Sequence, residues 1–389
     1  MLERNEAASI EIITSVGEIE PAQWDACAGP DNPFVSHAFL HALESSGSAS
    51  GRRGWLPRHL VVRDSAGSLC AAAPLYLKSH SYGEYVFDWA WADAYERAGG
   101  RYYPKLQCAS PFTPVTGPRL MVRHDLDSVA RYEAEETLAA GLVVAAERHG
   151  ASSVHVTFPT RAEWQTLGRH GFLQRVGMQY HFMNPGYRDF EDFLDALASR
   201  KRKQIRRERR EVAESGIRLH CLHGSEMEPR HWEAFYDFYL ATADKRWGFP
   251  YLKPEFFEDI GRTMGDRILM VLAEAPDGRP VAGALNLLGN DAVYGRNWGC
   301  LEDYSFLHFE ACYYQAIEYA IENGFARVEA GAQGEHKIQR GYLPVETYSA
   351  HWFADSRLEA GVADFLEREQ RAVRARIAGL GEHSPFKRT

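Results

Sequence analysis

The sequence lacks the spacings that disulfide frameworks and metal sites need. Its six cysteines lie far apart and form no Cys-x-x-Cys pair, so we expect reduced, packed thiols. The 16 histidines include no His-Glu-x-x-His sequence. His308 and Glu310 have the spacing of the His-x-Glu element of zinc deaminases, but no Pro-Cys-x-x-Cys segment follows to supply the other ligands. We therefore expect no bound metal.

Long apolar runs and an excess of basic residues are missing as well. The longest apolar run, near residues 69–77, is far too short to cross a bilayer. The N-terminal segment MLERNEAASIEIITSV has charges where a secretory signal peptide needs its apolar part. Lys and Arg number 44 against 53 Asp and Glu, and this balance opposes a surface that binds DNA. These features predict a cytoplasmic protein without a membrane span.

An internal repeat is the clearest feature that is present in the 389 residues. Residues 60–63 and 69–77 predict two strands joined by a turn, and residues 268–273 and 281–288 predict the same arrangement. Helices predicted over 130–149 and 304–323 each end at a glycine, which suits the left-handed position after a helix. The sequence therefore predicts two similar domains.

The match continues to the end of each repeat, where His181 in the first copy corresponds to His351 in the second. Each copy predicts mixed strands flanked by helices, so the expected fold class is α/β with mixed sheets. We expect a first domain over 1–190 and a second over 191–389, with a cleft between them.

A basic segment follows the first repeat. Residues 200–210 hold eight basic side chains and one acid, and the residues from 199 to 215 favour a single helix. This helix is either a solvated surface or a contact for a polyanion, such as the phosphates of a nucleotide-linked substrate or an RNA backbone. The candidate phosphate-binding or RNA-binding residues are Arg202, Lys203, Arg206 and Arg207.

Several segments resemble the Fem-type aminoacyl transferases of cell-wall synthesis, which contain two GNAT-like acyl-CoA N-acyltransferase folds. In the second half these are KQIRRERREVAESGI (203–217), RVEAG (327–331) and GEHKIQRGYLP (334–344). NPFVSHAFLHALESSG (32–47) and CASPFTPVTGPRL (108–120) extend the similarity to the bacterial FemAB-like group. The resemblance implies a tandem pair of GNAT-like folds.

The family has an acidic residue near the end of a strand, followed by Gly-x-x-Lys-Phe-Lys-x-Gly-Phe. By this resemblance Glu329 takes the acidic position and Lys337 that of the first lysine. Gln339 stands where the second lysine is expected, and Arg340 offers a positive charge one position later. In the first copy His155 replaces the acid, so that half is expected to be a degenerate scaffold.

Acyl transfer to an amine needs a base, donors for the developing oxyanion and groups that position two substrates. Residues 327–342 supply all three types, and alternate residues 294–298 of the preceding predicted strand share one face. The candidate catalytic residues are Glu329, Glu335 and His336. The candidate substrate-binding residues are Lys337, Arg340, Tyr342, Gln333, Arg296, Trp298, Tyr294 and His308.

The resemblance implies a transferase that moves an aminoacyl or acyl group to an amine of a small-molecule or cell-wall-precursor acceptor, in connection with peptidoglycan biosynthesis. Its donor co-substrate is either an aminoacyl-tRNA or an acyl-CoA, and no tightly bound cofactor is expected. The nearest match to the acetyl-CoA signature, at Gln165, Gly168 and His170, ends in a residue with a Cβ where backbone must approach phosphate. The alternative is a non-catalytic recognition module with the same fold.

Overall fold

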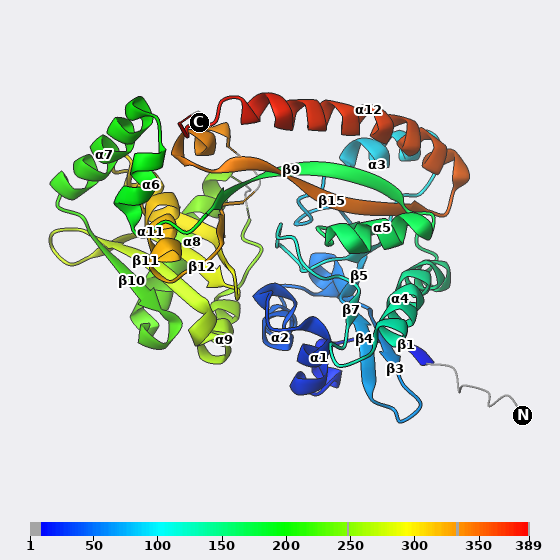
Figure 1. The fold of residues 1–389 in the computed structure, drawn as a ribbon. Coiled ribbons are helices and arrows are strands. Elements are labelled where there is room, and N and C mark those ends of the chain that lie inside the picture. The colour runs from blue at the N-terminus through cyan, green and yellow to red at the C-terminus, as the bar shows by residue number, and fades with distance from the viewer. Residues whose placement is uncertain (1–8, 247–248, 332–333, 388–389) are drawn as a thin grey trace, which may run out of the picture. The chain divides into compact units, whose positions relative to one another are not determined.

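The structure is a computed structural model that describes residues 9–246, 249–331 and 334–387 (Figure 1). The chain forms two compact units: unit 1 comprises residues up to 177 and 346–374, and unit 2 comprises the remainder. These units differ from the predicted domains, because the chain leaves unit 1 within strand β9 (Leu173–Met183) and returns within β15 (Leu343–Phe353). Most of β15 and of helix α12 (Ser356–Gly381) therefore belongs to unit 1.

Unit 1 contains two groups of strands, in the orders β1-β3-β4-β7 and β2-β5-β6-β8, with residues 349–353 of β15 paired to β8. One strand was predicted over 69–77, but Pro74 divides it into β4 and β5 because proline has no N–H to donate. The strands are β1 (Ser9–Ile13), β2 (Trp55–Pro57), β3 (His59–Arg63), β4 (Leu69–Ala73), β5 (Leu75–Lys78), β6 (Lys105–Cys108), β7 (Met121–Val122) and β8 (Ser153–Thr157).

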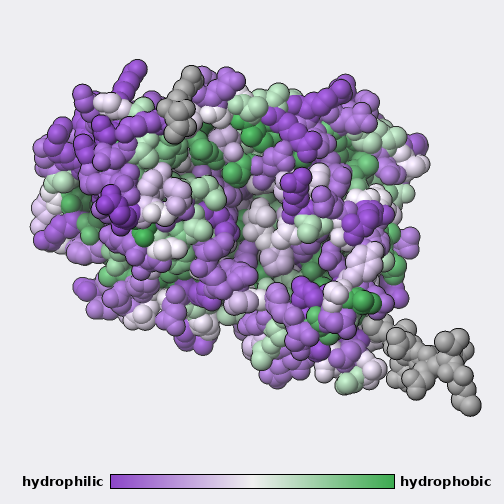
Figure 2. Space-filling model, in the orientation of Figure 1, coloured by the Kyte–Doolittle hydropathy of each residue, from purple (hydrophilic) through white to green (hydrophobic). Residues whose placement is uncertain are grey.

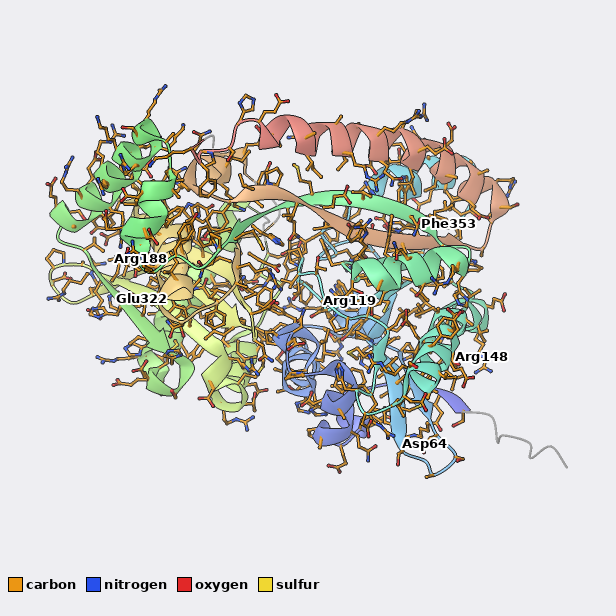
Figure 3. The ribbon with its side chains drawn as sticks, viewed as in Figure 1. Asp64, Arg119, Arg148, Arg188, Glu322 and Phe353 are labelled. Carbon is orange, nitrogen blue, oxygen red and sulfur yellow. The ribbon has the colours of Figure 1, made fainter. Side chains whose placement is uncertain are left out.

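Helix α4 (Ser128–His149) covers the main core of unit 1 through Leu138 and Leu142. Asp127 caps its first turn, and Gly150 ends it at φ 57°, the left-handed conformation that the sequence predicts there. Arg119 lies inside the unit (Figure 3) and donates to the carbonyl oxygen of Thr157 at 2.9 Å. The other helices are α1 (Pro21–Ala28), α2 (His37–Ser45), α3 (Trp89–Arg97) and α5 (Arg161–Arg169), with 3-10 turns η1 (Val16–Glu18), η2 (Pro33–Val35) and η3 (Gly51–Arg53).

Unit 2 has strands in the order β10-β11-β12-β13-β14, with residues 181–183 of β9 paired to β14. The strands are β10 (Arg218–His223), β11 (Ile268–Glu274), β12 (Pro280–Leu288), β13 (Ala292–Cys300) and β14 (Arg327–Glu329). The helices are α6 (Phe190–Ala196), α7 (Ser199–Glu214), α8 (Pro229–Arg246), α9 (Pro254–Thr263), α10 (Leu307–Phe309) and α11 (Gln315–Glu322), with short turns η4 (Gly224–Glu226), η5 (Gly265–Arg267), η6 (Glu310–Tyr314) and η7 (Glu335–Arg340).

The helix predicted over 304–323 is interrupted in the structure. It consists of α10, a π-helical turn η6 and α11, and the predicted glycine cap, Gly324, has φ 72°. Such π-turns occur frequently at functional sites. This turn adjoins η7, since the ring of Tyr313 lies 5.9 Å from that of His336.

The two units pair their strands in the same way, which confirms the repeat. In unit 1, β8 pairs in parallel with β6 and antiparallel with β15, and this places His155 opposite His351. In unit 2, β14 pairs in parallel with β13 and antiparallel with β9, and this places Glu329 opposite His181. The acid that the sequence singled out therefore lies beside a histidine of the other repeat.

Candidate functional site

The candidate site lies at the C-terminal end of β14. The parallel ladder between β13 and β14 extends only from Ala292 to Tyr294 on β13, although β13 continues to Cys300. In the described part of the chain, β14 therefore leaves the remainder of β13 unpaired on that side. Mixed sheets with flanking helices open for ligands at such points, where a strand ends and its neighbour diverges.

Glu329, the last residue of β14, is 3% exposed and has one engaged and one unengaged carboxylate oxygen. Its Oε1 accepts a hydrogen bond from Nε of Arg327 at 2.9 Å. Arg327 also pairs with Asp291 and donates to the hydroxyl of Tyr294 at 3.3 Å. Oε2 of Glu329 has no hydrogen-bond partner among the described residues. One buried carboxylate oxygen is therefore free to act on a neighbouring group.

That neighbour is His181, a residue that the site prediction did not include. Its Nε2 lies 3.6 Å from Oε2 of Glu329. Burial lowers the pKa of His181, with the Glu329 carboxylate opposing the shift, so the imidazole is neutral at neutral pH. The sequence signal was the equivalence of His181 and His351 in the repeat, but only strand pairing brings His181 to Glu329.

Lys337 lies in η7 and is 4% exposed. Its Nζ donates to the carbonyl oxygens of Ala330 and Gly331, at 2.6 and 3.1 Å, directly after the end of β14. No carboxylate pairs with it among the described residues, and burial lowers its pKa to about 8. An ammonium without a counter-charge attracts an anion, and two of its three hydrogens are already directed by the backbone.

His336 and Glu335 occupy different surroundings. The Nε2 atom of His336 lies 3.1 Å from the hydroxyl of Tyr313, and burial lowers the pKa of this histidine. Glu335 is exposed, and its carboxylate accepts a hydrogen bond from Arg376 at 2.6 Å. Both residues are exposed, but Glu335 has a surface ion pair, whereas one side of the His336 ring lies against Phe309 and Tyr313.

Arg340 and Tyr342 were predicted to contact substrate, but the structure encloses both. Arg340 makes two 3.0 Å bonds to the carboxylate of Glu208, and its guanidinium lies 3.4 Å from the ring centroid of Phe309. Tyr342 is fully buried and donates to the carbonyl of Tyr313 at 3.3 Å. Both side chains therefore have internal partners, which hold η7 in place.

The predicted shared face on β13 is interrupted by a bulge. Asn286 and Leu285 of β12 pair with Gly295 and Asn297, so the ladder skips Arg296. An extra residue reverses the alternation of side chains beyond it, which separates Tyr294 from Trp298.

The other residues that were predicted to bind substrate near β13 differ in what they contact. Tyr294 is buried beside Arg327, whereas the ring of Trp298 packs edge-on against His308 with centroids 5.3 Å apart. Gln333, also predicted to bind substrate, lies outside the described residues.

The basic segment forms one helix, α7, as predicted, but its charge is largely balanced nearby. The surface around α7 is mainly hydrophilic (Figure 2). Arg202 pairs with Asp195 at 2.8 Å, Arg206 pairs with Glu191, and Arg207 pairs with Glu211 at 3.4 Å, while Lys203 is exposed. Exposed pairs of this kind contribute under about 1 kcal/mol, so a phosphate can replace the carboxylates.

The segment nearest to the acetyl-CoA signature does not form a phosphate cradle. Gln165 and Gly168 lie in the last turns of α5, whereas a cradle uses the free N–H groups at a helix start. A Cβ on Gly168 would lie 2.7 Å from Nε2 of Gln174, so a side chain already occupies the space above this glycine.

No group of three or more His, Cys, Asp or Glu side chains in the described ranges has a geometry that holds a metal ion. Within the same ranges, none of the helices combines the length and apolar character needed to cross a membrane.

Comparisons with known proteins agree on a family and a fold. Residues 15–388 match the model of the FemAB-like family, described as peptidoglycan biosynthesis/recognition. The structure of FemX aligns with a TM-score of 0.53 and 13% identity, covering 89% of this chain and 98% of that one. The C-terminal domain of a putative lysylphosphatidylglycerol synthetase from Agrobacterium fabrum aligns with a TM-score of 0.54 and 11% identity, covering 91% and 97%. No curated protein matches in sequence. The predicted tandem GNAT-like fold is confirmed.

Proposed function

Because this chain belongs to the FemAB-like family of peptidoglycan biosynthesis and recognition, we propose that it transfers an aminoacyl or acyl group to an amine. The acceptor is a small molecule or a cell-wall precursor, and the reaction takes place in the cytoplasm. The observation that carries this proposal is the placement of Glu329 against His181, beside Lys337, where β13 and β14 diverge.

In the proposed reaction the acceptor amine attacks the acyl carbon and loses a proton to Nδ1 of His181, which is neutral before the reaction. Nε2 already carries a hydrogen, because it faces Oε1 of Gln179 at 3.3 Å and Oε2 of Glu329. Oε2 of Glu329 then faces the positive imidazolium at Nε2 and stabilises it. A C–N bond forms, and the C–O bond of an aminoacyl ester or the C–S bond of a thioester breaks. The proton returns to the leaving oxygen or sulfur.

Lys337 supplies the positive charge in this proposal. Its two backbone bonds fix the ammonium, and the remaining N–H binds either the developing oxyanion or a phosphate of the donor. Glu335, His336, Arg296, Trp298 and His308 remain candidate contacts around this centre.

Lys337 gives a test with a defined pH dependence. We expect Lys337→Ala to raise KM for the donor, and Lys337→Arg to restore it, if an anion binds there. Since the pKa of Lys337 is about 8, the ammonium is charged below that pH and neutral above it. Donor affinity should therefore fall above about pH 8 in the wild type but stay constant in the arginine variant, because arginine remains charged. A fully active alanine variant would contradict this role.

The identity of the donor depends on α7. If the donor is an aminoacyl-tRNA, replacing Arg202, Lys203, Arg206 and Arg207 by alanine should weaken tRNA binding. The negative slope of log K against log salt should become less steep, by about 0.7–0.9 for each lost phosphate contact. Binding of acyl-CoA should not change. Filter binding or fluorescence anisotropy at several salt concentrations measures both ligands, and an unchanged slope would exclude α7 as the RNA contact.

The direct experiment is a transfer assay with the full chain. Mixtures of charged tRNAs and of acyl-CoAs are incubated with amine-bearing cell-wall precursors, and mass spectrometry detects an acylated acceptor. Binding of a precursor without transfer from any donor would favour the recognition module instead, which the family description also includes.

A further inference from the structure

Unit 1 contains two buried lysines that lie opposite each other on adjacent strands of a sheet. Lys78 at the end of β5 and Lys105 at the start of β6 are direct cross-strand partners. They are 1% and 0% exposed. Like charges in opposite positions of a sheet repel each other, and burial removes the water that would screen them. A pair of this kind needs an anion.

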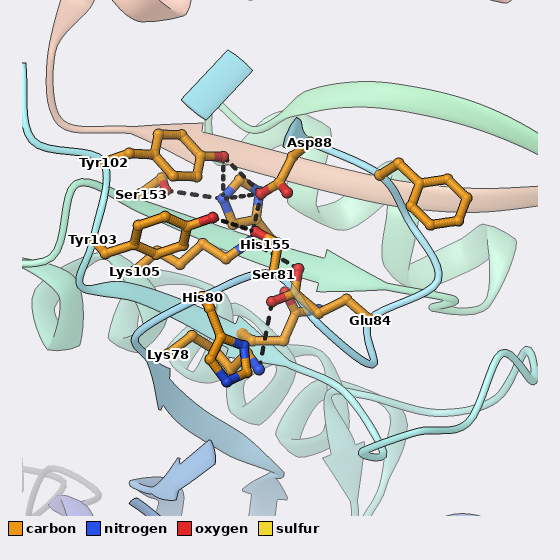
Figure 4. A network of polar contacts seen from close by, with 12 residues as sticks. Lys78, His80, Ser81, Glu84, Asp88, Tyr102, Tyr103, Lys105, Ser153 and His155 are labelled. Atoms are coloured by element: carbon orange, nitrogen blue, oxygen red, sulfur yellow. Dashed lines mark hydrogen bonds and ion pairs between the residues drawn. The ribbon is translucent and has the colours of Figure 1, made fainter. Parts of the chain in front are cut away.

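In the structure the anions come from the loop between β5 and α3 (Figure 4). Oε2 of Glu84 accepts a 2.7 Å bond from Nζ of Lys105, which also donates to Oγ of Ser81 at 2.7 Å and to Asp88. Asp88 accepts a further bond from the hydroxyl of Tyr102 at 2.8 Å. Lys105 is therefore fully surrounded by acceptors.

The same loop provides fewer hydrogen-bond acceptors for Lys78 than for Lys105. Oε1 of Glu84 stays 3.7 Å from Nζ of Lys78 and has no hydrogen-bond partner among the described residues. Nζ of Lys78 donates to the carbonyl of Tyr82 at 3.2 Å and lies 3.6 Å from a ring centroid of Trp55. Burial also lowers the pKa of Lys78 to about 7 and raises that of Glu84 to about 7. Glu84 and Asp88 together match the charge of the two lysines, but Glu84 makes its close contact with Lys105 and stays 3.7 Å from Lys78.

The loop between β5 and α3 buries charged side chains and exposes aromatic ones, which is the reverse of the usual distribution. Glu84 and Asp88 are buried, whereas Tyr82 and Phe87 are 46% and 57% exposed. Apolar side chains therefore contribute little to holding this loop. Polar contacts hold it instead: those with the two lysines, a backbone bond from Phe112 to the carbonyl of Gly83 at 3.2 Å, and a bond from Arg175 to the carbonyl of Phe87 at 2.9 Å. The lysines themselves stand on strands, which are the rigid part of the arrangement.

We propose that Lys78 and Lys105 form an anion-binding site in unit 1, and that Glu84 covers it as an internal substitute for the ligand. A ligand carboxylate or phosphate displaces the Glu84 side chain, bonds both ammonium groups and satisfies the open valences of Lys78. Asp88 remains on Lys105. This site is independent of the acyl transfer proposed for unit 2, and it makes unit 1 a ligand-binding unit where the sequence predicted only a scaffold.

An internal competitor lowers the apparent affinity for the ligand in proportion to the fraction of molecules in which the site is open. Removing the competitor should therefore increase the affinity for the ligand. The variant Glu84→Gln keeps the shape of the side chain and removes its charge. We expect it to bind inorganic phosphate or acetate about tenfold or more tightly than the wild type in calorimetric titrations at constant ionic strength. The comparison of phosphate with acetate shows which anion the site prefers.

Two matched variants check the assignment. Adding Lys78→Met to Glu84→Gln should abolish the gain, whereas Glu96→Gln, which removes an exposed carboxylate from α3, should leave affinity at the wild-type level. A gain that persists without Lys78, or no gain in the folded Glu84→Gln variant, would overturn the proposal.

Hydrogen exchange of the wild-type chain provides a measurement that does not depend on any variant. Amides of residues 79–88 should exchange faster as phosphate replaces chloride at constant ionic strength, because the displaced loop loses its contacts with the lysines. Exchange that is slowed or unchanged over the whole titration would overturn the displacement of Glu84.

Discussion

Replacing Glu329 by glutamine is expected to lower kcat of acyl transfer by about 10²–10⁴-fold, the range for loss of assisted proton transfer. The substitution removes the negative charge that lies 3.6 Å from Nε2 of His181, so the imidazolium formed in the reaction is no longer stabilised. Substrate affinity should change little, because the proposed donor contact is Lys337. Single-turnover transfer separates the chemical step from binding.

Two controls make this result specific. Glu322→Gln, an exposed carboxylate on α11 (Figure 3), should retain full activity. His181→Gln should show a loss of similar size, and the double variant should be no worse than either single one, because the two residues act as a unit. Thermal unfolding of Glu329→Gln measures any loss of stability from the altered partner of Arg327. Undiminished transfer in a folded Glu329→Gln variant would exclude this pair from the reaction.

The variant Arg340→Met is expected to destabilise the fold by about 3–5 kcal/mol, the cost of leaving a buried charge without its partner. Glu208 is 1% exposed, and its carboxylate accepts two 3.0 Å bonds from Arg340 together with a bond from the hydroxyl of Tyr314. Denaturant unfolding should show the loss as a lower midpoint.

The pair also offers a recovery experiment. Adding Glu208→Leu to Arg340→Met removes the unpaired charge, so much of the lost stability should return. Arg188→Met breaks an exposed pair with Asp192 in the same unit (Figure 3) and should leave stability nearly unchanged, because water screens this pair. Equal effects of Arg340→Met and Arg188→Met would contradict the importance of burial at Arg340.

The location of the candidate site followed from the sequence because it depends on local patterns. A glycine-ended helix, a short strand and the segment GEHKIQRGYLP are contiguous in the chain, so the motif itself placed Glu329 and Lys337 near each other. The partners of these residues could not be predicted in the same way. His181 reaches Glu329 across 148 positions of chain only because β9 pairs with β14.

The bulge at Arg296 shows a second kind of limit. Alternation along 294–298 predicts one shared face, but a single extra residue in the ladder reverses it, and Gly295 beside it was the local signal that could have marked the position. The burial of Arg340 could not be predicted locally either. Its charge suggested a contact with substrate at the surface, but the side chain forms an internal ion pair with Glu208.

The sequence by itself determined the repeat, the mixed α/β fold class, the family and the position of Glu329 and Lys337, because periodicity and motifs are properties of neighbouring residues. The tertiary structure alone decided which charges are buried and what they face: His181 at Glu329, Glu208 at Arg340, and Glu84 over Lys78 and Lys105. These contacts depend on strand pairing and on the exclusion of water, and both are set by residues far apart in the chain.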